Sequence, residues 1–92
     1  MERCRVQIFY SGRVQGVGFR YTVKSLAAGF EVTGMIRNLE DGRVEMVAEG
    51  TRAELEAFQA AIGESEVGPF IRHADVTWSQ AQNEFRGFII AR

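Results

Sequence analysis

Cysteine, proline and histidine each occur only once among the 92 residues, and long apolar runs are absent. The single cysteine, Cys4, cannot form an internal disulfide, which excludes a disulfide-stapled secreted scaffold and favours a reducing compartment. No apolar run approaches the roughly 20 residues that are needed to span a bilayer. Residues 1–10 also lack the apolar segment and the cleavage site of a signal peptide. We therefore expect a soluble cytoplasmic protein that does not bind membranes.

Acidic side chains are missing from residues 3–30, close to the N-terminal third of the chain. All charged side chains of residues 3–30 are basic, namely Arg3, Arg5, Arg13, Arg20 and Lys24. Residues 40–66 carry most of the acids, which we interpret as solvated surface. The net charge is −1 and the pI is about 5.8, which argues against a nucleic-acid binder because phosphate-backbone affinity needs a basic surface. The asymmetry favours a small anionic ligand near the N-terminal third.

Apolar residues recur with the periods of strands and helices. Alternation predicts five strands, at residues 4–10, 32–39, 43–49, 72–79 and 85–91. Helical spacing predicts two helices, one from Phe19 or Arg20 to a stop at Gly29, and one from the N-cap Thr51 to a stop at Gly63.

Local signals predict how these elements are joined. Glu40-Asp41-Gly42 lies between two strand patterns, where Asp-Gly indicates a hairpin turn. Thr51 and Glu54 have the spacing of a reciprocal capping box at the start of the second helix. Residues 64–69, which include Pro69, are expected to form a loop.

The element order β-α-β-β-α-β with an added C-terminal strand predicts an α+β fold of the ferredoxin-like, split βαβ class. Right-handed crossovers would place both helices on one face of a mostly antiparallel sheet. Compact domains run from about 50 to 250 residues, so we expect residues 1–92 to form a single domain. This fold class carries enzymes, metal carriers and RNA binders alike, so function must be argued from a site.

The segment between the first strand and the first helix has the composition of an anion-binding loop. Gly12, Gly16 and Gly18 lie within seven residues, and Arg13 and Arg20 lie among and just after them. Glycines allow successive amides to point inward at the positive end of the following helix dipole. Arg20 in the first helical turn opposes that dipole, and a bound anion would remove the conflict.

Other phosphate-binding and metal-binding motifs do not fit the sequence. The segment lacks the lysine and hydroxyl of a Walker A loop, and its glycine spacing differs from the dinucleotide fingerprint. A C-x5-R phosphatase would need a cysteine nucleophile where Val14 stands. A metal carrier with a C-x-x-C motif is excluded by the single cysteine.

Two motifs together resemble one known family. The segment from Gly12 to Arg20, GRVQGVGFR, resembles the signature of the acylphosphatase family. The segment from Gly34 to Val44, GMIRNLEDGRV, followed by Gly50, resembles the family's second motif. Together with the element order, the resemblance covers essentially the whole chain. It implies a metal-independent enzyme without cofactors that hydrolyses the carboxyl-phosphate anhydride of acyl phosphates to a carboxylate and inorganic phosphate.

The resemblance also implies roles for individual residues. Arg20 corresponds to the phosphate-binding arginine of the family, and Asn38 corresponds to the asparagine that orients the attacking water. The backbone amides that correspond to the phosphate cradle are those of Gln15, Gly16, Val17, Gly18, Phe19 and Arg20. Met35 and Tyr10 depart from the family's usual aromatic and aliphatic residues, and we interpret both as packing positions.

Two other functions compete with this interpretation. An RNA-recognition domain would carry aromatic residues on its third strand, but residues 43–49 contain none and include two acids. A non-catalytic phosphate- or carbamoyl-phosphate-binding module, such as the acylphosphatase-like domain of carbamoyltransferases, would keep the loop without turnover. A chain that starts at Met1 and has both Arg20 and Asn38 favours a stand-alone enzyme, which we expect to be a monomer.

Overall fold

A computed structural model describes residues 2–92 and contains one five-stranded sheet and two α-helices. The strand order in the sheet is β4-β1-β3-β2-β5. In chain order the elements are β1 (Arg3–Gly12), α1 (Phe19–Ala27), β2 (Thr33–Asn38), β3 (Val44–Thr51), α2 (Arg52–Glu64), a 3-10 helix (Gly68–Phe70), β4 (Ile71–Gln80) and β5 (Phe88–Ile90).

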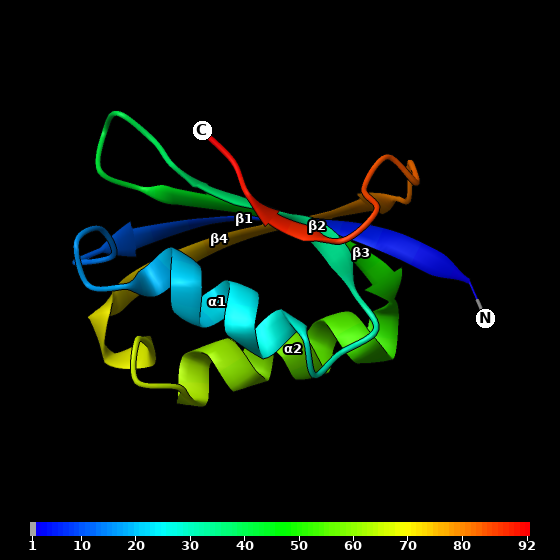
Figure 1. The fold of residues 1–92 in the computed structure, drawn as a ribbon, viewed down its shortest axis with the longest axis horizontal. Helices are drawn as coiled ribbons and strands as arrows, with labels where there is room; N and C mark the ends of the chain where they lie inside the picture. The colour runs from blue at the N-terminus through cyan, green and yellow to red at the C-terminus, as the bar shows by residue number, and fades with distance from the viewer. Residues whose placement is uncertain (1) are drawn as a thin grey trace.

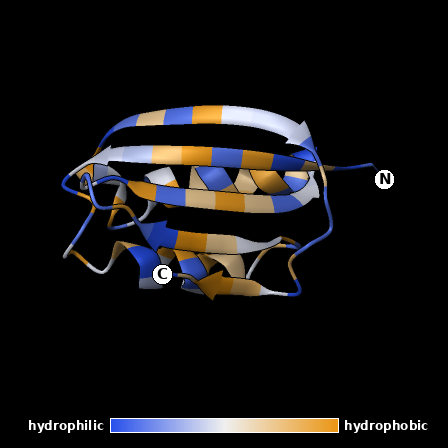
Figure 2. Cartoon of the chain, turned by 90° about the horizontal axis from the view of Figure 1, so that it is seen from above, coloured by the Kyte–Doolittle hydropathy of each residue, from blue (hydrophilic) through white to orange (hydrophobic). Residues whose placement is uncertain are grey.

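The two helices lie side by side on one face of the sheet (Figure 1). The other face carries no helix, and Figure 2 looks onto it, with hydrophobic and hydrophilic residues alternating along the strands. Strand β3 is central and is buried from Val44 to Gly50. All strand pairs are antiparallel except β2 with β5, which is parallel. The predicted α+β, split βαβ fold is therefore confirmed.

The core lies between the helices and the sheet. It is built from alternate residues of the strands and from one stripe on each helix, as the hydrophobic periods predict. Its largest fully buried apolar side chains are Phe19, Phe58, Ile8, Ile36, Met46, Leu55 and Ile62.

The first helix ends as predicted, with Gly29 as the C′ residue after the cap residue Ala28, whereas the second predicted stop is one residue early. Helix α1 ends at Ala27, and the amides of Gly29 and Phe30 donate to the carbonyls of Leu26 and Ala27 at 3.0 and 3.1 Å. Gly29 does not adopt a positive φ. The tight final turn of α1 therefore needs no residue in the left-handed conformation. Helix α2 continues past the predicted stop at Gly63 to Glu64.

The predicted loop at residues 64–69 runs into a 3-10 helix at Gly68–Phe70, with Pro69 in its first turn. Gly68 packs so closely on Gly63 that a Cβ atom there would overlap the Gly63 carbonyl. This contact lets the chain turn sharply from α2 into β4. The sequence contains the two glycines but not the information that they meet.

Only half of the predicted capping box is formed at the start of α2. The Thr51 hydroxyl accepts a hydrogen bond from the Glu54 amide at 3.3 Å, as predicted. The carboxylate of Glu54 does not reach back to Thr51, because it accepts instead from the backbone amide of Glu31 at 2.7 Å. The side chain therefore ties α2 to the segment that precedes β2.

The acids of residues 40–66 are not all solvated, which corrects the sequence-based interpretation. Glu49 is completely buried and Glu45 is 6% exposed. Glu45 accepts hydrogen bonds from Gln7 and Arg37, both at 2.7 Å. These cross-strand partners on the helix-free face of the sheet compensate the cost of burying a carboxylate.

Candidate active site

The glycine-rich loop leaves the sheet at Gly12, where the pairing of β1 with β4 changes register. Gly12 has φ +128°, and a Cβ atom there would collide with the carbonyl of Phe70 and the amide of Arg72. The next residue, Arg13, donates its amide to the Phe70 carbonyl at 3.0 Å. Glycine is required here both for the backbone conformation and for the close approach.

The middle of the loop is anchored to the rest of the molecule by two side chains. Val14 is 1% exposed and belongs to the core. The Gln15 side-chain amide donates to the carbonyl of Leu39 at 2.8 Å and to that of Arg43 at 2.9 Å. The loop therefore lies against the turn that joins β2 to β3, and both lie at the same end of the molecule (Figure 1).

The loop ends at the N-terminus of α1 with two residues in the left-handed region. Gly16 and Gly18 have φ +79° and +78°, in positions where a Cβ atom would meet nothing within 4 Å. Gly18 is the N-cap residue of α1, so no side chain caps this helix, and its first turn contains no acid. Within residues 2–92, the backbone amides of residues 15–20 donate no hydrogen bond to another protein group.

Arg20 lies in the first turn of α1, beside these amides. Its guanidinium forms no ion pair or side-chain hydrogen bond with the described part of the chain. The preceding residue, Phe19, holds the helix start in the core by packing on Tyr10 with ring centroids 5.2 Å apart. Burial raises the pKa of the Tyr10 phenol, so this ring is a neutral packing group, as its sequence position predicts.

Asn38 is the last residue of β2. It pairs with Val44, which in turn pairs with Tyr10. Directly opposed residues of a sheet point to the same face, so Asn38 projects to the face that carries α1. Its Oδ1 atom is buried and has no hydrogen-bond partner among the described residues, which is unusual because buried polar atoms are normally paired.

These contacts bring both sequence motifs to one end of the fold. Residues 15–20 supply amides and a cation, and Asn38 supplies a free acceptor oxygen next to the hairpin turn that Gln15 contacts. The arrangement can hold an anion by dipoles and one fixed positive charge. The Gln15 side-chain contacts are not indicated by the sequence, which identifies this residue only by its backbone amide.

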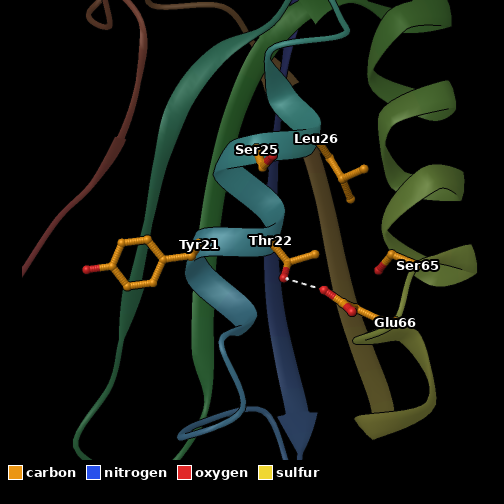
Figure 3. Close-up of a pocket in the computed structure, with 6 residues that line it drawn as sticks. All are labelled: Tyr21, Thr22, Ser25, Leu26, Ser65 and Glu66. Carbon is orange, nitrogen blue, oxygen red and sulfur yellow. Dashed lines mark hydrogen bonds between the residues drawn. The ribbon is translucent and has the colours of Figure 1, made fainter.

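A hollow lies along α1, beyond its first residues. It is lined by Tyr21, Thr22, Ser25, Leu26, Ser65 and Glu66. Figure 3 shows the Thr22 hydroxyl turned toward the Glu66 carboxylate, while Tyr21 projects away from both. The hollow has an acid and no base in its lining, so it does not suit an anion.

Two further properties of the described residues bear on the expectations from sequence. No group of three or more His, Cys, Asp or Glu side chains lies close enough to hold a metal ion in residues 2–92. No helix in this same part of the chain has the length and apolar character to cross a membrane.

Comparison with known proteins identifies the family. The family model described as Acylphosphatase matches residues 6–90. A relative named acylphosphatase from Roseiflexus sp. (strain RS-1) is 43% identical over 98% of this chain and 97% of its own length.

Solved structures agree with this match. The crystal structure of acylphosphatase from Bacillus subtilis has a TM-score of 0.87 and 36% identity, and the match covers 97% of this chain and 99% of that one. Full-length HypF in a phosphate- and nucleotide-bound form has a TM-score of 0.84 and 27% identity over 99% of this chain but 12% of its own. The family match over nearly the whole sequence and the likeness to proteins of the same length lead to one conclusion: this chain belongs to the acylphosphatase family.

Proposed function

We propose that this chain hydrolyses acyl phosphates at the end of the sheet where the glycine-rich loop meets the β2–β3 hairpin. The products are a carboxylate and inorganic phosphate. The observation that carries the proposal is the set of six consecutive amides, residues 15–20, that have no protein acceptor within residues 2–92. They lie at the uncapped start of α1, whose first turn contains Arg20.

The phosphate group would be bound by these amides and by Arg20. Phosphoryl transfer needs mainly correct positioning and stabilisation of charge on the equatorial oxygens. The Arg20 guanidinium is permanently charged and can donate two parallel hydrogen bonds to phosphate oxygens. The loop amides are fixed dipoles that need little reorganisation as charge develops.

The attacking water would be held by Asn38. Its buried Oδ1 is a free acceptor, so it can accept a hydrogen bond from a water and keep the water oxygen directed at phosphorus. As the new oxygen–phosphorus bond forms, the bond from phosphorus to the acyl oxygen breaks. The electron pair leaves with the carboxylate, and a phosphate oxygen takes the water's proton.

The leaving group explains why this set of residues is sufficient. A carboxylate is the conjugate base of an acid with a pKa near 4, so it departs without a general acid. The proposed mechanism therefore uses no histidine or carboxylate, and it requires neither a metal ion nor a cofactor. Recognition through the phosphate makes small differences in the acyl group unimportant.

The proposal also covers the setting in which the enzyme acts. We place the activity in a single domain, residues 1–92, that acts as a monomer in the cytoplasm on a small-molecule substrate. The unpaired Cys4 is compatible with a reducing compartment. A non-catalytic phosphate- or carbamoyl-phosphate-binding module is not favoured, because relatives that match over nearly their full length are named acylphosphatases.

Hydrolysis of benzoyl phosphate by the purified chain in EDTA tests the proposal. We expect rapid turnover by the wild type and a loss of at least about 10²-fold in kcat/KM for Arg20→Gln, because this residue contacts phosphate in both ground and transition states. Lys24→Gln is the matched control, since it removes a positive charge one turn further along the same helix.

The possible results separate the alternatives. Turnover by the wild type and by Lys24→Gln, but not by Arg20→Gln, supports the proposed site. Phosphate binding without turnover by the wild type would instead favour the non-catalytic module. Turnover that disappears only when EDTA is added would contradict the metal-independent mechanism.

A further inference from the structure

The Gln15 side chain joins the loop to both sides of the turn between β2 and β3. Its Nε2 donates to the carbonyl of Leu39 at 2.8 Å and to that of Arg43 at 2.9 Å. These two residues face each other across the base of the turn, where the Leu39 amide donates to the Arg43 carbonyl at 2.8 Å. A primary amide has two N–H donors, and Gln15 uses its nitrogen to contact both sides of the turn at once.

The contact is next to Asn38. Leu39 directly follows Asn38 in the chain. Arg43 directly precedes Val44, which is the partner of Asn38 across the sheet. A displacement of the hairpin base relative to the loop would move Asn38 with it. The Gln15 side chain therefore links the loop to the turn that directly follows Asn38.

The rest of the loop is anchored independently of Gln15. The entry is fixed by Gly12 and by the hydrogen bond from Arg13 to Phe70, and Val14 is buried in the core. The exit is fixed by Phe19, which is buried against Tyr10. Loss of the Gln15 side chain should therefore leave the amide cradle and Arg20 in place while it frees the hairpin.

We propose that Gln15 is a positioning residue that aligns the oxygen of Asn38 with the phosphate held by residues 15–20. The inference rests on the proposed function, because it assigns to Gln15 a part in the same reaction. Misplacement of an aligned group by about 1 Å can cost on the order of 10²-fold in rate. The side chain acts on turnover through Asn38 and contributes little to the binding of phosphate.

The experiment compares Gln15→Met, which keeps the length of the side chain and removes its donors, with the wild type. We expect a fall of about 10- to 100-fold in kcat for benzoyl phosphate, with the Kd for inorganic phosphate changed by less than about threefold. In an Asn38→Ala background the same substitution should change kcat by less than about threefold, since residues that act as a unit are not additive.

The matched control is Gln7→Met. Gln7 is also a half-buried glutamine on the sheet, and its Nε2 donates to Glu45 at 2.7 Å on the helix-free face. This control should keep wild-type kcat and Kd. If Gln15→Met does not fold, Gln15→Asn replaces it, because the same amide one methylene shorter loses the reach to both carbonyls.

Three results would overturn the inference. The first is a folded Gln15 variant whose kcat equals that of the wild type, while Asn38→Ala is slow. This result would contradict the role of Gln15 and would still support the proposed function. The second is an equal loss in the presence and absence of the Asn38 side chain. The third is loss of phosphate affinity in parallel with kcat, which would assign Gln15 to the loop alone. An inactive wild type would remove the proposed function itself, and the inference with it.

Discussion

The guanidinium of Arg5 lies 3.1 Å from the carboxylate of Glu49, directly across the pair of strands β1 and β3. Glu49 is completely buried and also accepts from the amides of Gln82 and Asn83, at 2.7 and 2.8 Å. One carboxylate thus attaches the segment before β5 to the central strand. Burial opposes ionisation, yet the two amides and Arg5 outweigh it and hold the pKa of Glu49 below its usual range.

Glu49→Gln should lower the free energy of unfolding by about 2 kcal/mol at pH 7, because Arg5 loses a buried charge partner. A carboxyl whose pKa is lower in the folded state stabilises the fold above its unfolded pKa, about 4.3. That stability is lost as the pH falls through the folded value. Urea titrations at pH 7, 5 and 3 should show the wild type approaching the variant only below about pH 4.3.

Glu56→Gln is the control for this comparison, since Glu56 forms an exposed pair with Arg52 one helical turn away. It should change stability by less than about 0.5 kcal/mol at any of these pH values. A difference between wild type and Glu49→Gln that stays constant down to pH 3 would show that ionisation of Glu49 is unimportant.

Asn38→Ala should reduce kcat by on the order of 10²–10³-fold without unfolding the protein. The Oδ1 atom has no partner within the described residues, so its removal breaks no hydrogen bond of the fold. Steady-state kinetics on benzoyl phosphate with thermal unfolding in parallel would measure both effects. Thr33→Ala, at the other end of β2, should retain activity, and full activity in a folded Asn38→Ala would exclude Asn38 from the mechanism.

Gly18→Ala should weaken inorganic phosphate binding and destabilise the fold by about 1–2 kcal/mol, the cost of a left-handed conformation for an L-residue. Steric overlap is not the cause, because a Cβ atom there meets nothing within 4 Å. Gly63→Ala also enters open space, but in the last turn of α2 with no positive φ. It should be neutral or stabilising, by up to about 1 kcal/mol, and equal losses for both variants would argue against a backbone effect.

The value of kcat should show little dependence on any side-chain pKa between pH 5 and 7. The proposed mechanism moves the water's proton to the substrate phosphate, so no protein group has to change its protonation state. A pH profile of kcat tests this, together with His73→Asn, which removes the only histidine of the chain. A steep bell-shaped profile that His73→Asn abolishes would contradict the mechanism.

Local sequence was sufficient for most of the secondary structure. The hairpin at Glu40-Asp41-Gly42 and the cap at Thr51 depend on residues within four positions of one another, and both are formed. The strand periods also correctly place alternate residues of β1 in the core. Errors occur where a distant residue competes, as when the Glu54 carboxylate binds the Glu31 amide instead of closing the capping box.

The candidate site also has parts that local sequence predicts and parts that depend on the tertiary fold. Glycine spacing and the position of a helix start, which are local properties of the chain, predict an anion-binding loop beside Arg20. The resemblance to the family assigns the amides of residues 15–20 to it. Their proximity to the hairpin that carries Asn38 follows from strand order, because β3 lies between β1 and β2 and brings residues of separate motifs to one edge. The Gln15 contacts span 24 and 28 positions, and no local pattern encodes them.

The sequence by itself determined the α+β element order and the family resemblance, and it predicts that residues 12–20 bind an anion, because these depend on neighbouring residues and on recurrent spacing. Only the tertiary structure decided that Glu45 and Glu49 are buried acids and that Gln15 joins the loop to the hairpin. The physical reason is that burial and side-chain partners are set by which strands become neighbours. That choice is made by packing of the whole core, and a residue's own surroundings in the sequence do not contain it.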